Sequence, residues 1–186
     1  VDAAYRKTKL QAKGDLQAMI EALAELPLEF SPGDQWNYSV STDVCGYLVE
    51  HFSGMKLDKY FQKHIFDPLG MGDTGFSCAK DKVERLASLY EHHPKKGPVL
   101  VDPGGSKTAR VKTRRMLSGG GGLLSTMADY YRFCSMLLNQ GELDGNRIIG
   151  RKTLAMMASN HLPDGKDLTE MSQSAFSETT YQGVGF

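Results

Sequence analysis

The chain has 186 residues, of which 40% are hydrophobic and 24% charged, a composition typical of a soluble globular protein and not of a disordered or fibrous one. Its 22 Lys and Arg residues balance 22 Asp and Glu residues, so no net charge favours a nucleic-acid backbone or an anionic membrane surface. No run approaches the ~18 apolar residues of a membrane-spanning helix, and the charged N-terminal segment lacks the apolar centre of a signal peptide. We therefore expect no nucleic-acid partner and no membrane span.

Three cysteines, Cys45, Cys78 and Cys134, lie far apart and form no C-x-x-C pair. This spacing argues against a disulfide framework and a zinc site, so we interpret the three as small buried hydrophobic residues. The pair His92-His93 lies in a loop without further ligands at metal-binding spacing. We expect neither a metal nor another cofactor.

The first clear element is an amphipathic helix. Apolar residues from Leu16 to Leu26 recur at i, i+3, i+4 and i+7, with Asp15 placed to cap the N-terminus and Pro27 to end the helix. Residues 31–34 form a turn by composition, and a short extended stretch with Tyr38 follows.

Two more helices are predicted before residue 70. Ser41 or Thr42 is expected to cap the first, and Gly54 lies just past its end. The second begins at Asp58 and is expected to stop before Pro68.

In the second half of the chain, the residue pattern predicts a long irregular connection and then a well-marked helix. From Glu91 to Ser118 the periodicity fades and proline and glycine recur, which indicates a loop with short strands. Thr126 and Asp129 have the spacing of a capping box that opens a helix running to Gly141. The remaining predicted elements are a tight turn at Asp144-Gly145, a helix around Leu154 and the start of a strand at residues 181–186.

Four blocks occur in a fixed order: P-G-x-x-W-x-Y-S at 32–39, S-G-M at 53–55, P-L-G-M-G-D-T-G-F at 68–76, and S-G-G-G-G-L-L-S-T at 118–126. Together they resemble the serine β-lactamase-like and penicillin-binding-protein superfamily, and within it the esterases related to class C β-lactamases (family VIII carboxylesterases). The resemblance covers residues 27–186. Four blocks in the same order are specific, whereas no single block would be.

The resemblance implies an α+β fold of the β-lactamase and DD-peptidase type, in which helices pack with an antiparallel sheet. It implies a serine nucleophile and lysine in an S-x-x-K motif, a catalytic tyrosine, and a third motif on a C-terminal strand. Tyr38 matches the tyrosine. We expect residues 1–186 to be a partial domain, mainly the helical part and inactive alone, because the S-x-x-K region and the third motif are missing.

Two strings fit S-x-x-K, at Ser53 to Lys56 and at Ser77 to Lys80. In the family the nucleophile lies far upstream of the tyrosine, whereas both of these serines follow Tyr38. We therefore interpret both strings as structural.

The chemistry of Tyr38 requires a nearby cation, because a phenol that titrates near pH 10 accepts a proton at neutral pH only if its phenolate is stabilised. No Lys or Arg lies between Lys13 and Lys56, so the cation must come from elsewhere in the fold. The alternative interpretation is that Trp36 and Tyr38 are aromatic packing anchors.

Val40 stands where many members of the superfamily carry an Asn that binds a substrate amide. Valine cannot make that hydrogen bond, which favours carboxylic esters as substrates. Asp43 either lines the pocket or caps its helix. The residues expected to bind substrate are Ser39, Val40, Asp43, Gly119 and Gly120.

The glycines at 119–122 fit neither phosphate-binding motif, so they are expected to form a pocket wall or a flexible turn. The expected function is a metal-free serine hydrolase that forms an acyl-enzyme on small carboxylic esters. Alternatives are a β-lactamase or DD-peptidase acting on β-lactam-like molecules, and a non-catalytic binding module. The sequence leaves oligomeric state open, and leaves cytoplasm and periplasm as alternative compartments.

Overall fold

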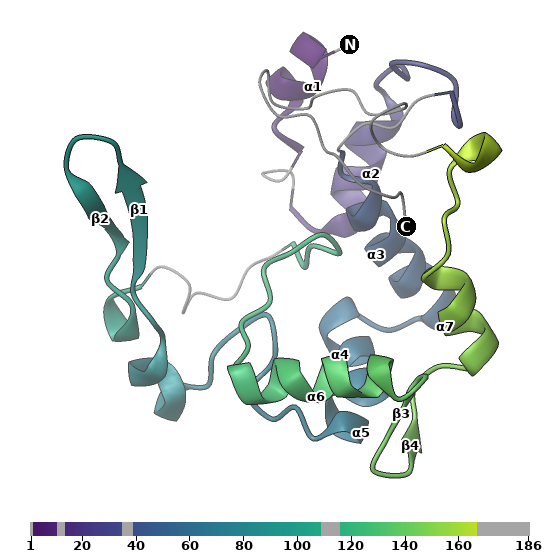
Figure 1. The fold of residues 1–186 in the computed structure, drawn as a ribbon. Helices are drawn as coiled ribbons and strands as arrows, with labels where there is room; N and C mark the ends of the chain where they lie inside the picture. The colour runs from purple at the N-terminus through teal and green to yellow at the C-terminus, as the bar shows by residue number, and fades with distance from the viewer. Residues whose placement is uncertain (1, 11–13, 35–38, 109–115, 167–186) are drawn as a thin grey trace.

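A computed structural model of the chain describes residues 2–10, 14–34, 39–108 and 116–166 (Figure 1). Within these residues the fold is mainly helical with two small antiparallel sheets, as the α+β prediction requires. The helices are α1 (Asp2–Thr8), α2 (Leu16–Ala24), α3 (Ser41–Ser53), α4 (Leu57–Phe61), the π-helix η2 (Gln62–Phe66), α5 (Asp67–Leu69), α6 (Met127–Leu138) and α7 (Arg151–Met157). Short 3₁₀ helices are η3 (Lys80–Arg85), η4 (Gly105–Lys107) and η6 (Pro163–Gly165). In the part of the chain so described, no helix is long and apolar enough to cross a membrane.

The start of α2 confirms the predicted cap, but the start of α3 does not. Asp15 accepts a hydrogen bond from the N–H of Ala18 at 3.1 Å. In α3, Val40 occupies the N-cap position and Ser41 is already helical, so the prediction of a Ser41 or Thr42 cap is wrong. The Ser39 hydroxyl, two positions before Ser41, accepts the Ser41 N–H at 3.1 Å.

The helix predicted to stop before Pro68 instead continues through it. After α4 the chain widens into η2, and α5 follows with proline in its first turn. Proline is tolerated there because a first-turn N–H needs no partner within its own helix. Gly70, with φ of 64°, ends the helical run.

The second half contains the predicted helix and turn. Thr126 accepts a hydrogen bond from the N–H of Asp129 at 3.1 Å, which confirms this cap of α6. Asp144 and Gly145, both with positive φ, join β3 (Glu142–Leu143) to β4 (Asn146–Arg147). The predicted strand at 181–186 lies outside the described residues.

The long connection contains a hairpin of β1 (Leu89–His93) and β2 (Gly97–Asp102), paired antiparallel. Figure 1 shows it standing apart from the helices. Its large apolar residues are exposed; Tyr90, for example, is 58% exposed.

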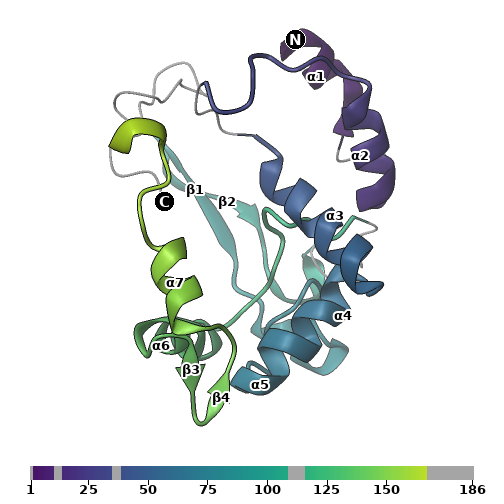
Figure 2. The ribbon, with the colours of Figure 1, turned by 90° about the vertical axis from the view of Figure 1, so that its right-hand side faces the viewer.

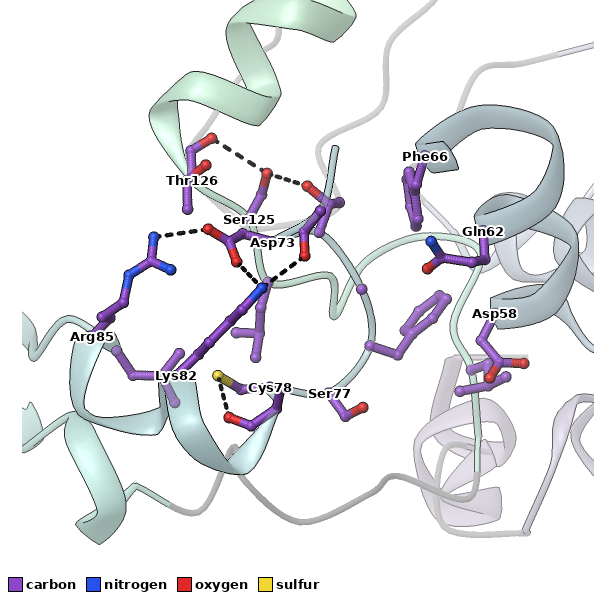
Figure 3. A pocket seen from close by; sticks show the side chains of 18 of the residues that line it. Asp58, Gln62, Phe66, Asp73, Ser77, Cys78, Lys82, Arg85, Ser125 and Thr126 are labelled. Carbon is purple, nitrogen blue, oxygen red and sulfur yellow. Dashed lines mark hydrogen bonds and ion pairs between the residues drawn. The ribbon is translucent and has the colours of Figure 1, made fainter. Parts of the chain in front are cut away.

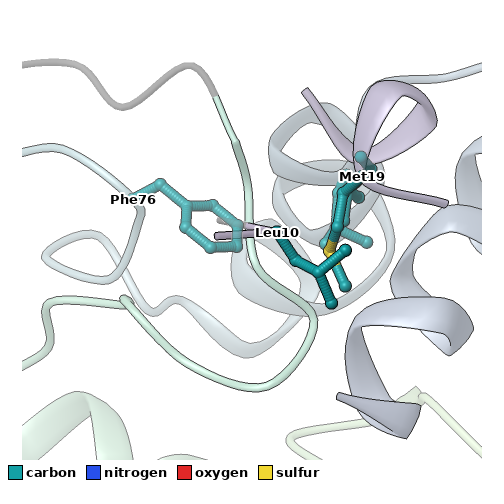
Figure 4. Close-up of a cluster of buried hydrophobic side chains, with 5 residues drawn as sticks. Leu10, Met19 and Phe76 are labelled. Carbon is teal, nitrogen blue, oxygen red and sulfur yellow. The ribbon is translucent and has the colours of Figure 1, made fainter. Parts of the chain in front are cut away.

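Two hydrophobic clusters hold the helices together. The first joins α2 to the start of α4 and to Phe76, and Figure 4 shows Leu10, Met19 and Phe76 meeting in it. The second packs α5 against α6, which lie close together in Figure 2, and its buried members are Phe66, Leu69, Met71 and Met136. The cysteines belong to neither cluster: Cys45 and Cys134 are exposed and Cys78 is half-buried, so the prediction that they are buried is wrong.

Candidate functional site

The structure brings together most of the residues that the sequence singles out. Ser39 and Val40 lead directly into α3, Asp43 lies in its first turn, and Gly119 and Gly120 pack on that same turn. Tyr38 lies outside the described residues. Its role, and those of the five residues expected to bind substrate, stay predictions.

The contact between the glycine run and α3 is made by main chain. A Cβ atom added at Gly119 would lie 2.1 Å from the carbonyl oxygen of Thr42 and 3.0 Å from the nitrogen of Gly46. A Cβ at Gly120 would lie 2.6 Å from the Thr42 hydroxyl oxygen, whereas one at Gly121 would meet no atom within 4 Å. Only glycine allows two backbone segments to approach this closely, so packing requires Gly119, whereas the atoms nearest to Gly120 belong to side chains.

Asp43 has a defined partner across this contact. Its side chain is only 5% exposed and accepts a hydrogen bond from the Ser118 hydroxyl at 2.5 Å. The same hydroxyl accepts the Gly120 N–H at 3.1 Å. Sequence analysis proposed a pocket lining or a helix cap for Asp43 and missed Ser118, because no local pattern links residues 75 positions apart.

Val40 is half-buried and packs against the first hydrophobic cluster, which fixes the turn that precedes α3. Ser39 is exposed, and its hydroxyl lies 2.5 Å from that of Ser41. Two neighbouring residues thus have different roles: one anchors the chain and the other keeps a hydroxyl at the surface.

The contacts of the string Ser53 to Lys56 favour its structural interpretation. The Ser53 hydroxyl donates to the Val49 carbonyl at 2.5 Å. The Lys56 ammonium group donates to Glu50 at 3.1 Å, and this hydrogen bond raises the pKa of Lys56 above its ordinary value. A lysine that activates a serine must give up its proton near neutral pH, which is the opposite tendency.

A cavity of about 390 Å³ lies between the run of α4 and η2, the loop 72–79, η3 and the segment 117–126 (Figure 3). Lys82, Arg85 and Asp73 lie toward one end of it, and Phe66 and Gln62 toward the other. Sequence analysis did not predict this cavity, because its walls come from four separate segments.

An ion-pair cluster supports the charged end of the cavity. Asp73 lies 2.5 Å from the Lys82 ammonium nitrogen and 2.8 Å from an Arg85 guanidinium nitrogen. Hydrogen bonds from these two cations hold the pKa of Asp73 below its ordinary value. Behind them, buried Asp129 accepts from the Asp73 N–H and the Thr74 hydroxyl, each at 2.8 Å. The cluster fastens the loop 72–75 to α6.

In the ranges that the structure covers, no three His, Cys, Asp or Glu side chains gather as possible ligands of a metal ion. Tyr5, near Asp43, has its pKa raised above the ordinary value by burial and by the Asp43 carboxylate.

Comparison with known proteins places this geometry in a family. The Beta-lactamase family profile matches residues 2–182. Protein Rv1367c of Mycobacterium tuberculosis is 34% identical over 152 residues, which cover 78% of this chain and 35% of that protein. Lovastatin esterase of Penicillium rubens is 32% identical over 145 residues, which cover 76% of this chain and 36% of that protein.

A solved structure agrees with the match in sequence. EstCE1, described as a hydrolase with promiscuous acyltransferase activity, superposes with a TM-score of 0.68 at 24% identity, covering 83% of this chain and 44% of EstCE1. The chain therefore spans about a third of the length of the curated relatives it matches. Because the family profile covers nearly the whole sequence, and the fold agrees with it, the chain belongs to the Beta-lactamase family, which includes esterases and acyltransferases.

Proposed function

We propose that the complete protein is a serine hydrolase that cleaves small carboxylic esters through an acyl-enzyme, with Tyr38 as the general acid and base. The observation that carries the proposal is the packing of Gly119 and Gly120 on the first turn of α3. This contact places the block at 118–126 against the helix that begins at Ser41, three residues after Tyr38 in the sequence.

The local chemistry supports acyl transfer to and from a hydroxyl group. In acylation the tyrosine takes the proton of the nucleophilic serine as its oxygen attacks the ester carbonyl, and it then protonates the leaving alkoxide. In deacylation it takes a proton from the water that attacks the acyl carbonyl, and it returns that proton to the serine oxygen as the ester bond to serine breaks. Each step requires a cation beside the phenol, because the phenolate is otherwise too basic to persist at neutral pH.

The substrate preference rests on Val40. An ester has no amide group that needs a partner at this position, whereas a β-lactam side chain does. Because valine offers no hydrogen bond, the amide of such a substrate would lose its solvation without compensation. Short acyl esters are therefore the proposed substrates. Ser39, Asp43, Gly119 and Gly120 are the other proposed contacts of the substrate site.

The role of Tyr38 is tested by Tyr38→Phe in the complete protein, with p-nitrophenyl butyrate as substrate. We expect kcat to fall by roughly 10² to 10⁴, the usual range for loss of a general base, since the ring remains and only the hydroxyl is removed. Tyr131→Phe, at a tyrosine that is 70% exposed on α6, is the matched control and should change kcat by less than about twofold. A folded Tyr38→Phe protein with full activity would mean that Tyr38 is a packing anchor.

The substrate class is tested on the unaltered protein. We expect kcat/KM for p-nitrophenyl butyrate to exceed that for a chromogenic cephalosporin by at least ~10-fold, which corresponds to about 1.4 kcal/mol of transition-state binding. The 186-residue chain alone should hydrolyse neither. Preference for the cephalosporin would replace the proposed esterase with a β-lactamase.

A further inference from the structure

The hydroxyl of Ser118 has both of its hydrogen-bonding roles occupied. It donates its only proton to the Asp43 carboxylate at 2.5 Å and accepts the Gly120 N–H at 3.1 Å. A serine hydroxyl rotates freely unless partners fix it. Because Asp43 is 5% exposed and a carboxylate is a strong acceptor, this hydroxyl has one preferred orientation.

The hydrogen bond from Ser118 to Asp43 joins the glycine segment to α3, and the one from the Gly120 N–H to Ser118 lies within the glycine segment. Gly119 rests on the Thr42 carbonyl and on Gly46, so the glycine run cannot move closer to α3. Packing of this kind resists approach, but it does not resist sliding or separation. The Ser118 hydroxyl supplies the directional restraint, because it holds the Gly120 peptide at a fixed angle to the helix.

We infer that Ser118 is a positioning residue, which holds the main chain of Gly119 and Gly120 against the first turn of α3. It thereby fixes the distance between the two segments that are proposed to bind substrate. The inference rests on the proposed function. It also gives Asp43 a role that differs from a pocket wall or a helix cap: its carboxylate is the buried acceptor to which Ser118 is fastened.

The consequence is specific to substrate binding. A looser glycine run leaves Tyr38 and the nucleophile chemically intact, so it should weaken the productive binding of substrate more than it slows the chemical step. The pH dependence of kcat should not change, because the residue that transfers protons is untouched.

The test compares Ser118→Ala, Ser118→Thr and Ser125→Ala in the complete protein. Ser125 is the matched control, since its hydroxyl lies on the same segment and also makes a side-chain hydrogen bond, to Thr74 at 2.8 Å. For p-nitrophenyl butyrate we expect Ser118→Ala to raise KM about tenfold, the usual effect of losing one hydrogen bond to a charged group, with kcat within about twofold. Ser118→Thr should restore the KM, and Ser125→Ala should leave it unchanged.

Several results would overturn the inference. These are an unchanged KM in Ser118→Ala, an equal rise in Ser125→Ala, or a shifted pH profile. If Ser118→Ala does not fold, Ser118→Cys provides the same test, because a thiol is a weaker donor and acceptor than a hydroxyl: a raised KM supports the inference and an unchanged one refutes it. An inactive wild-type protein would refute the proposed function and this inference together, whereas an active wild type with unaffected Ser118 variants would refute the inference alone.

Discussion

The glycine-rich segment 116–126 is held at its two ends by different means. Near its start, Gly119 packs on the main chain of α3, and the half-buried Ser118 hydroxyl donates a hydrogen bond to Asp43 of that helix. At its end, Leu124 pairs with Gly75 as an isolated β-bridge, and Ser125 and Asp129 bind Thr74. Backbone atoms meet at Gly119, whereas the charged side chains of Asp73, Lys82 and Arg85 line a cavity at the second end.

The predicted substrate-binding residues and this cavity therefore lie at different ends of the segment. The described residues that are predicted to bind substrate lie at the tightly packed end, whereas the block at 68–76 lies beside the cavity, at the end where Asp73 pairs with Lys82 and Arg85. Cavities are the default location of a binding site, but these cations are already engaged by Asp73. The motif residues and the contacts between them therefore identify the candidate site better than the volume of the cavity does.

The largest loss of stability is expected from a substitution that disrupts the packing of Gly119 on α3. Gly119→Ala places a Cβ atom 2.1 Å from the carbonyl oxygen of Thr42, a backbone atom that cannot rotate away. We expect it to destabilise the complete protein by about 3 kcal/mol or more, at the upper end for overpacking. Gly121→Ala, where no atom lies within 4 Å, should cost less than about 0.5 kcal/mol. Urea unfolding of both variants measures the difference, and equal stabilities would refute the packed contact.

A somewhat smaller effect is expected at the other end. Asp129→Ala removes the acceptor of the Asp73 N–H and of the Thr74 hydroxyl, both partly buried. The Thr74 hydroxyl still has Ser125 within 2.8 Å, whereas the Asp73 N–H loses its acceptor. Leaving one such group unpaired costs about 1–3 kcal/mol, and we expect a loss of that size in the same unfolding experiment. Asp81→Ala, at an exposed carboxylate on η3, is the control and should be close to neutral. If the two variants were equally stable, Asp129 would not support the loop 72–75.

The ion pairs at this end predict a modest dependence of stability on pH. Lys82 and Arg85 lower the pKa of Asp73 in the folded protein, so the ionised carboxylate favours folding. This contribution is fully present above the ordinary value of 3.8 and is lost as the pH falls through the lower folded pKa. Asp73→Asn should therefore flatten the fall in Tm between about pH 5 and pH 2. An unchanged slope would mean that the ion pairs contribute nothing.

The smallest effect concerns the charge of Asp43. Burial raises the pKa of Tyr5 first, and the Asp43 carboxylate raises it further. Asp43→Asn removes only the second cause, so the Tyr5 pKa should fall part of the way toward 10. Titration of the Tyr5 ring resonances by NMR measures the shift. A rise in the pKa would contradict the placement of Asp43 beside Tyr5.

The sequence was informative where the determining contacts are local. Asp15 and Thr126 cap their helices as predicted, because each side chain reaches a backbone N–H three residues on. It was misleading at α3, where the Ser39 hydroxyl reached the Ser41 N–H first, and at Pro68, which η2 and α5 accommodate. At each point two local rules competed, and tertiary packing decided between them.

The candidate site was predictable only in part, for the same reason. The family blocks gave Ser39, Val40 and Asp43, together with the glycine run. The hydrogen bond between Asp43 and Ser118 links positions that no periodicity relates, and the cavity walls come from four segments. Such contacts are consequences of the completed fold and leave no local pattern in the sequence.

The central claim is that the complete protein forms an acyl-enzyme on a serine other than Ser53 and Ser77, the serines of the two S-x-x-K strings in this chain. The most direct measurement treats the complete protein with a p-nitrophenyl alkylphosphonate, which phosphonylates an activated serine irreversibly, and maps the modified residue by peptide mass spectrometry. We predict one phosphonylated serine, at the start of an S-x-x-K motif outside residues 1–186, and much slower labelling in Tyr38→Phe. Labelling of Ser53 or Ser77, or esterase activity that survives the reagent with no serine modified, would contradict the account.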